Sequence, residues 1–193
     1  MQLPSSLPQV VLETPRLLLK ELNPAITDHI YTSWTDAQLS DYLGITEAEL
    51  AAERENYRKG LTTFRLSFKH FLLVHKATDI VIGKAGFHSW HLPHARAEIG
   101  YSLFIENVKQ QGYMTEALAA ILAYGFDELK LNRIEAFASP RNEPSMRLLQ
   151  RFGFTREGLL REHYFKNGRM EDSACFGLLR SEYYGIRKEI KQG

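Results

Sequence analysis

The spacing of hydrophobic residues along the chain changes several times, and each spacing predicts one kind of element. An apolar-rich run from Val10 to Leu22 predicts a first strand. Two further runs, Phe71 to His75 and Ile80 to Gly83, are separated by a short polar turn and predict a strand pair. Two more strands are predicted at Ala97 to Ile105 and at Arg133 to Ala138.

Helical spacing first becomes clear from Tyr113 to Leu131. One face of this predicted helix is apolar at steps of three and four residues: Met114, Ala117, Leu118, Ile121, Leu122 and Phe126. Upstream, Thr46 and Glu49 form a capping box that predicts the start of an earlier helix. Pro144 stands where a first helical residue would, and Gly153 where a left-handed C′ residue would, so a short helix is predicted between them.

The last part of the chain carries the strongest turn signal. Asn167-Gly168 is typical of a two-residue hairpin, and it predicts that Leu160 to Lys166 pairs with Met170 to Leu179. A polar helix is predicted from Glu182 onward.

Strands and helices in this order predict an α/β (α+β) layer fold around one mixed sheet. The stretches Ile26 to Thr46 and Ser89 to Arg96 match no periodic pattern, and we interpret them as loops that shape a substrate site. At 193 residues the chain is predicted to form a single domain, residues 1–193.

Composition narrows the function classes. The formal net charge is +1, with charges of both signs mixed along the chain, which argues against nucleic acid as a partner. Cys175 is the single cysteine, so an intrachain disulfide is excluded and a reducing compartment is expected. No signal-like N-terminus and no run of about 18 apolar residues is found, so we expect no membrane span. We expect a cytoplasmic protein, monomeric or homodimeric.

The segment from Ile105 to Leu118 carries the clearest chemistry. A strand is followed by a polar turn and a long helix, with Gly112 at the junction. The first N–H groups of a helix lack internal partners and favour an anion such as a diphosphate. Gly112 permits close approach of the backbone, and Lys109 adds a cation at the rim. An ordinary strand–turn–helix connection remains an alternative, and the missing Gly-Lys-Ser/Thr ending argues against ATP or GTP.

Lys109-Gln110-Gln111-Gly112-Tyr113-Met114 resembles the acyl-CoA pyrophosphate motif Gln/Arg-x-x-Gly-x-Gly/Ala of the GNAT acetyltransferases. The chain from about residue 12 to 179 resembles the RimJ/RimL-type branch of that family. The matching segments, in order, are Leu12 to Leu19, Ala97 to Leu103, Gly112 to Leu118, Asn142 to Ser145 with Phe152 to Phe154, and Glu157 to Glu162. Two positions depart from the motif. Lys109 loses the planar geometry of Gln or Arg, and Met114 replaces a small residue but falls on the apolar helix face.

The resemblance implies a GNAT fold, a mixed and mostly antiparallel central sheet flanked by helices, with a splayed strand pair that holds acetyl-CoA. Pantetheine is then expected along the backbone of Leu103, Phe104 and Ile105. The diphosphate is expected at Lys109, Gln110, Gln111, Gly112, Tyr113, Met114 and Thr115.

Asn142 and Ser145 correspond to the family residues near pantetheine. The resemblance implies that Ser145 gives a proton to the departing thiolate. The alternative is a serine whose hydroxyl satisfies a free N–H at a helix start.

Glu98 corresponds to the general base, acting directly or through a water. The alternative is a solvated glutamate that pairs with Arg96 or another cation. Glu162, His163 and Tyr164 lie where relatives carry polar groups on the substrate side, and they rank below Glu98. Which of these groups supplies the base stays open at this point.

Two other groups invite attention. His88, His91 and His94 lie in the run Gly86 to His94, which we interpret as a turn between strands. They are spaced as metal ligands can be, but no further ligand lies near, so we expect no metal. Cys175 sits in an apolar strand and is interpreted as an inert core thiol. Direct attack of an amine on acetyl-CoA in a ternary complex is therefore the expected mechanism.

A protein N-terminal α-amine is the expected acceptor, by likeness to the ribosomal-protein branch. An α-amine titrates near 7.7–8.0 and a lysine near 10.4, and the sequence shows no obvious histidine–carboxylate pair to assist a lysine. Two alternatives stay open. One is an enzyme for a small amine (a polyamine, an amino acid or an aminoglycoside). The other is a non-catalytic acyl-CoA-binding module, which intact Ser145 and Glu98 argue against.

Overall fold

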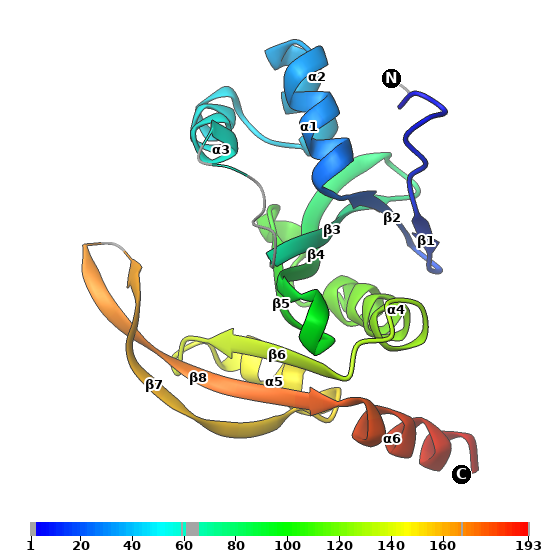
Figure 1. Cartoon of the computed structure of the whole chain (residues 1–193), viewed down its shortest axis with the longest axis vertical. Helices are drawn as coiled ribbons and strands as arrows, with labels where there is room; N and C mark the ends of the chain where they lie inside the picture. The colour runs from blue at the N-terminus through cyan, green and yellow to red at the C-terminus, as the bar shows by residue number, and fades with distance from the viewer. Residues whose placement is uncertain (1–2, 59, 61–65, 167, 193) are drawn as a thin grey trace.

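Figure 1 shows a computed structural model of the chain, which describes residues 3–58, 60, 66–166 and 168–192. Its centre is an eight-stranded sheet in the order β1-β2-β3-β4-β5-β6-β8-β7. Every neighbouring pair is antiparallel except β5 and β6. The strands are β1 (Val11–Glu13), β2 (Leu17–Leu22), β3 (Leu66–His75), β4 (Ile80–His91), β5 (Arg96–Leu103), β6 (Arg133–Ala138), β7 (Thr155–Lys166) and β8 (Arg169–Leu179).

Helices cover this sheet unevenly. They are α1 (Pro24–Ser33), α2 (Asp36–Leu43), α3 (Glu47–Arg58), α4 (Tyr113–Asp127), α5 (Glu143–Arg151) and α6 (Arg180–Gln192), with 3-10 turns η1 (Leu92–His94) and η2 (Glu106–Val108). Helices α1 to α3 gather over one end of the molecule, at the top of Figure 1. None of the described helices is long and apolar enough to cross a membrane.

The main core lies between α4 and the sheet. The predicted apolar face of α4 is buried, with Leu118, Ile121 and Phe126 at most 1% exposed. Phe87 on β4 packs so closely that a Cβ at Gly125 would stand 2.6 Å from its ring. Each such buried side chain contributes about 1.5–3 kcal/mol by leaving water. The strand and helix that frame the predicted cofactor segment are therefore held firmly.

Most predicted elements are confirmed. The Thr46–Glu49 capping box opens α3, with the Glu49 carboxylate accepting from Thr46 N–H at 2.8 Å. Strand β6 has the predicted bounds, and Gly153 follows α5 with φ of 80°. The β7–β8 hairpin forms with Lys166 opposite Arg169; the predicted turn residue Asn167 lies outside the described residues.

Two predictions of local structure are wrong near the N-terminus. The run Val10 to Leu22 is two strands, because the chain turns back where Thr14 N–H donates to Leu17 O (3.0 Å). The stretch Ile26 to Thr46 is not a loop but carries α1 and α2. Their signals are caps rather than apolar periodicity: Asn23 caps α1, and Thr35 opens α2 with a capping box.

The predicted turn at residues 86–94 is also wrong in its first half. Strand β4 continues to His91, because it pairs with β5 up to His91 opposite Arg96. Only Leu92–His94 form a turn, of the 3-10 type. This extension places His88 inside the sheet rather than on a loop.

Candidate active site

Strands β5 and β6 separate at a defined point. They pair at Arg96, Ala97 and Glu98, opposite Arg133, Ile134 and Glu135 respectively. No later pair joins β5 to β6 in the described chain, although β4 stays paired with β5 as far as Leu103. The result is a wedge-shaped gap, closed at Glu98 and open toward Leu103. The backbone of β5 facing this gap offers hydrogen-bonding groups to an amide-bearing ligand.

The predicted pantetheine segment lies at the open end of this gap. Phe104 donates its N–H to Ile82 O at 2.9 Å, so that group belongs to the sheet. Backbone groups alternate in direction along an extended chain, so Leu103 and Ile105 face the opposite way, toward the gap. Of the three residues expected to bind pantetheine, Phe104 is therefore the one whose N–H already has a partner in the sheet.

Gly112 precedes α4 at the same end. Its φ of 81° is left-handed, which glycine adopts without strain. A Cβ placed on Gly112 would find one described neighbour, Arg16 Nη2 at 3.5 Å. The N-cap carbonyl of Gly112 accepts from Glu116 N–H (3.0 Å), while the first-turn N–H groups of α4 point out of the helix. Glycine therefore leaves space at the start of α4 that a side chain at position 112 would occupy.

The predicted rim residues behave differently from one another. Lys109 pairs with Glu106 at 2.5 Å, and both side chains are well exposed, so this pair contributes little stability. Gln111 is turned back onto Asn107 O (2.6 Å), and Gln110 has φ of 59°. Met114 is 9% exposed and packs in the core, as its place on the apolar face predicted.

A clamp that sequence reasoning missed fixes this loop to the sheet. Arg16, in the β1–β2 turn, pairs through Nε with the Glu116 carboxylate (2.6 Å) and donates from Nη1 to Gln111 O (3.0 Å). Its guanidinium also lies 4.2 Å from the centre of the Tyr113 ring. The sequence contained the signal, since Arg16 and Glu116 both lie in segments that carry the family resemblance.

Asn142 and Ser145 lie at the start of α5. Asn142 caps the helix, since its Oδ1 accepts from Ser145 N–H at 3.2 Å. The interpretation of Ser145 as the capping serine is therefore wrong. Its hydroxyl instead lies 2.8 Å from the hydroxyl of Tyr101, which comes from β5 across the gap. Burial raises the pKa of Tyr101, so this second, unpredicted hydroxyl keeps its proton at neutral pH.

Glu98 lies at the closed end of the gap and is 13% exposed. Its Oε1 is 3.0 Å from His88 Nε2, and the Tyr164 hydroxyl donates to the same oxygen at 3.5 Å. Arg96 pairs with Glu135 instead, so the predicted alternative partner of Glu98 is wrong. The expectation that the chain holds no histidine–carboxylate pair is wrong as well.

Register explains why this pair was missed. His88 and Glu98 stand directly opposite on antiparallel β4 and β5, ten positions apart in sequence. Gly100 makes the room, because a Cβ there would stand 2.7 Å from His88 Cε1. Beyond His88 lies His70, with ring centres 6.1 Å apart. Burial, helped by the charges of Lys84 and His88, lowers the pKa of His70 to about 3, so this ring is neutral.

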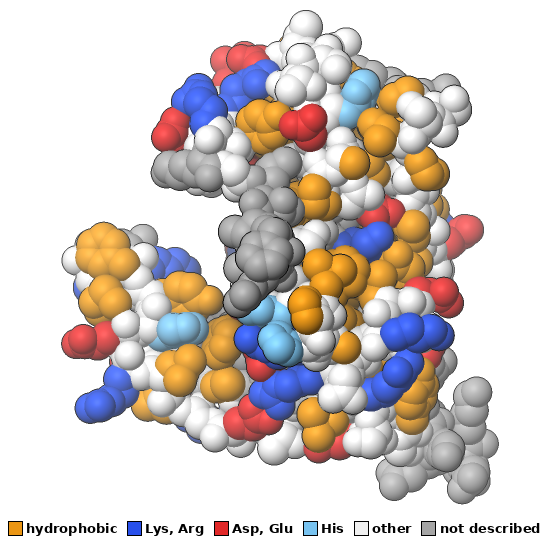
Figure 2. Space-filling view, viewed as in Figure 1, with side chains coloured by type: hydrophobic (Ala, Val, Ile, Leu, Met, Phe, Trp, Pro, Cys, Tyr) orange, Lys and Arg blue, Asp and Glu red, His pale blue; other side chains and the backbone are white. Residues whose placement is uncertain are grey.

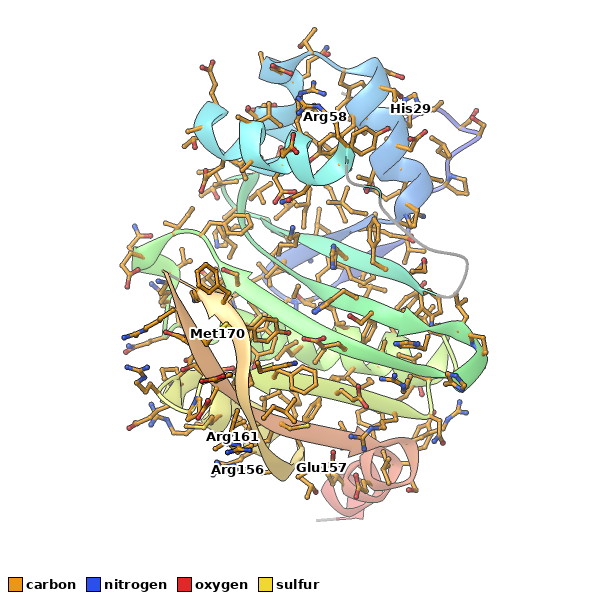
Figure 3. The ribbon with its side chains drawn as sticks, turned by 60° about the vertical axis from the view of Figure 1, so that its left-hand side comes forward. His29, Arg58, Arg156, Glu157, Arg161 and Met170 are labelled. Atoms are coloured by element: carbon orange, nitrogen blue, oxygen red, sulfur yellow. The ribbon has the colours of Figure 1, made fainter. Side chains whose placement is uncertain are left out.

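The β7–β8 hairpin borders the site on the side of Glu98. Figure 3 shows it standing in front of the sheet, with Arg161 and Met170 marking its length. Its pairing shifts between Leu160 and Tyr164, and Tyr164 is the one of the three lower-ranked candidates that reaches Glu98. Glu162 uses its N–H on Asp172 (2.9 Å), and His163 packs edge-on against Phe137.

Between hairpin and body the surface is hollowed. Figure 2 shows this hollow between the end of the hairpin and the α1–α3 end, and histidine side chains lie below it on both the hairpin and the body of the molecule. Under the α1–α3 end lies a pocket of about 630 Å³, within the usual range for small-ligand sites. Its lining includes His70, the neighbour of His88, and Phe104 of the predicted pantetheine segment. Its charges are of both signs, with Glu49 and Glu53 on α3 and Lys84 on β4.

The three histidines considered as metal ligands do not lie together. His88 contacts Glu98, whereas His91 and His94 contact each other with ring centres 6.2 Å apart. The described residues hold no group of three or more His, Cys, Asp or Glu placed for a metal ion. Cys175 is half-buried rather than in the core, and burial raises the pKa of its thiol, which keeps it unreactive.

Comparison with known proteins gives concordant results. Residues 16–155 match the family described as "Acetyltransferase (GNAT) domain". An uncharacterised N-acetyltransferase of Bacillus licheniformis, p20, is 36% identical over 176 residues, which cover 90% of this chain and 98% of p20. The crystal structure of a GCN5-related N-acetyltransferase from Brucella melitensis superposes with a TM-score of 0.68 at 26% identity, covering 93% of this chain and 82% of that one.

Two shorter matches have names that state an acceptor. The Bacillus subtilis "Putative ribosomal N-acetyltransferase YdaF" is 34% identical over 103 residues, 53% of this chain and 56% of its own length. A spermidine N(1)-acetyltransferase of Vibrio cholerae is 32% identical over 73 residues, 38% of this chain and 42% of its own length.

Proposed function

The chain belongs to the GNAT family and is an acetyl-CoA-dependent N-acetyltransferase, and we propose that its acceptor is the α-amine of a protein N-terminus, as in the RimJ/RimL-type branch. The observation that carries this proposal is the partly exposed imidazole of the His88–Glu98 pair beside the β7–β8 hairpin, which the end of a polypeptide can reach. We further propose that residues 1–193 act as one domain.

The gap between β5 and β6 fits an extended, amide-bearing arm. Leu103 and Ile105 would pair with that arm, and the first turn of α4 with Gly112 would hold the diphosphate. When bound, acetyl-CoA supplies the thioester that carries the acetyl group. Tyr101 and Ser145 flank the gap from opposite sides, and their linked hydroxyls can deliver a proton to a leaving sulfur.

The α-amine is favoured by its own acidity. Only the neutral amine attacks, and an α-ammonium ion titrates about 2.5 pH units below a lysine ammonium ion. Deprotonating the α-ammonium ion therefore costs roughly 3.4 kcal/mol less than deprotonating a lysine ammonium ion, whichever group takes the proton. The histidine–carboxylate pair lowers the cost for both amines and leaves that difference in place.

The pocket disfavours the main alternative, a polyamine. A polycation binds best to a pocket whose charged residues are all negative. Glu49 and Glu53 would attract it here, but Lys84 would repel it. The binding-module alternative is disfavoured by the intact hydroxyl pair and by the His88–Glu98 pair, since a sensor needs neither.

A matched pair of peptides tests the acceptor. The first has a free N-terminus and no lysine; the second has the same sequence with a blocked N-terminus and one lysine. We expect kcat/KM for the first peptide to exceed that for the second by about 10²-fold, since roughly 3.4 kcal/mol separates the two amines. Equal rates, or turnover of spermidine alone, would overturn the assignment of the acceptor.

A further inference from the structure

We propose that His88, rather than Glu98, removes the proton from the acceptor ammonium, and that Glu98 holds His88 in position for that task. This inference rests on the proposed function, because it concerns the amine that enters the hollow. It assigns the proton-accepting group, which the family resemblance had placed on Glu98.

Exposure separates the two members of the pair. The His88 side chain is 37% exposed, whereas that of Glu98 is 13% exposed. Both sit on the face of the sheet that the hairpin borders, and Tyr164 also reaches the glutamate oxygen from β7. An amine approaching from the hollow meets the imidazole first, while the carboxylate lies between His88, Tyr164 and the closed end of the gap.

The contact with Glu98 then selects the nitrogen that acts. His88 Nε2 is 3.0 Å from Glu98 Oε1, and a carboxylate oxygen, which carries lone pairs only, favours a hydrogen rather than a lone pair on the nitrogen that faces it. Nε2 therefore carries the hydrogen of the neutral ring, which leaves Nδ1 with a free lone pair. Nδ1 has no hydrogen-bond partner among the described residues, so it is available to the substrate. The arrangement repeats the roles of carboxylate and imidazole in hydrolase triads, where the carboxylate fixes the tautomer.

The neighbours of the ring suit this role. His70 on β3 is neutral, so it adds no charge against a protonated His88. The other basic groups of β4 are Lys84, four residues from His88 or about 13 Å along a strand, and His91, three residues from it. Glu98 stays the nearest charge, and it stabilises the imidazolium that proton transfer creates.

The proton balance closes with the groups present. An ammonium that becomes an amide loses two protons. The first passes to His88 Nδ1 before the nitrogen attacks, and it leaves to solvent from the hollow. The second is lost after the N–C bond forms and the C–S bond breaks, and it replaces on the hydroxyl pair the proton that Tyr101 and Ser145 deliver to sulfur.

Two readouts test the assignment. Long-range ¹H–¹⁵N spectra of the apo-protein report the tautomer directly, and we expect His88 to carry hydrogen on Nε2. Glu98→Gln should mix the tautomers, since an amide can both donate and accept. Hydrogen on Nδ1 of the wild-type protein would overturn the proposal without involving any substrate.

Kinetics supply the second readout, measured on whichever amine the wild-type enzyme accepts. We expect His88→Gln to lower kcat by about 10²–10⁴-fold and to leave the acetyl-CoA Kd unchanged. His94→Gln, an exposed histidine away from Glu98, is the matched control and should change nothing. Full activity in His88→Gln with a large loss in Glu98→Gln would make Glu98 the base. That result would overturn the inference and leave the proposed acceptor intact.

Discussion

Gly100 offers a way to disturb the His88–Glu98 pair without touching either residue. The substitution Gly100→Ala would place a Cβ 2.7 Å from His88 Cε1, closer than real Cβ contacts come, and 3.2 Å from Nδ1, which is tighter than most. The ring can swing away, because it is partly exposed and ends a flexible side chain. The 3.0 Å contact with Glu98 is then lost.

Stability and activity should respond very differently. Gly100 has no left-handed backbone, so alanine fits the strand and can even gain about 0.4–1 kcal/mol through the unfolded state. Displacing the proton acceptor, in contrast, should lower kcat by about 10²–10⁴-fold.

The assay is release of free thiol from acetyl-CoA with a saturating acceptor, alongside thermal unfolding of each variant. Gly185→Ala is the control, because a Cβ at Gly185 meets nothing within 4 Å. Full turnover in Gly100→Ala would refute the argument that the His88–Glu98 geometry matters. A large fall in melting temperature would refute the argument that the ring yields easily.

Gly112→Asp should abolish stabilisation by CoA, which is about 2.7 kcal/mol at a ligand concentration of 100 Kd, and thermal shift measures it. Ser145→Ala and Tyr101→Phe should each lower kcat with little change in acetyl-CoA affinity, whereas Asn142→Ala should instead cost about 1 kcal/mol of stability as a lost cap. Burial alone would raise the pKa of Glu116, but its hydrogen bonds and the nearby arginine outweigh burial and lower it below the usual 4.5. Its contribution to stability is thus complete above pH 4.5 and lost as the pH falls further, so urea unfolding of Glu116→Gln should lack that acid-side loss.

Secondary-structure elements could be predicted from the sequence where a strong pattern of neighbouring residues marks them. The apolar face of α4 is set by steps of three and four residues, so it was predictable, as was the pairing of β7 with β8. Helices α1 and α2 were missed because their apolar faces are short and their boundaries depend on caps. Local patterns therefore recovered the elements with strong periodicity or strong turns.

The site residues also fall into two groups: those that lie in continuous sequence motifs and those that only strand pairing brings together. Gly112 and Ser145 sit in continuous motifs and could be singled out from the sequence, whereas Tyr101, the partner of Ser145, could not. His88 was interpreted as a turn residue, because its relation to Glu98 exists only once β4 and β5 pair in one register. Cross-strand pairs of this kind need tertiary structure, since a single residue of slippage would point His88 to the other face.

The most direct test uses one peptide that carries both a free α-amine and an internal lysine, incubated with acetyl-CoA and the enzyme. Mass-spectrometric mapping of the product then locates the acetyl group. We expect a single addition at the N-terminal residue and an unmodified lysine. Acetylation of the lysine in preference, or an unmodified peptide under conditions where spermidine is turned over, would contradict the account.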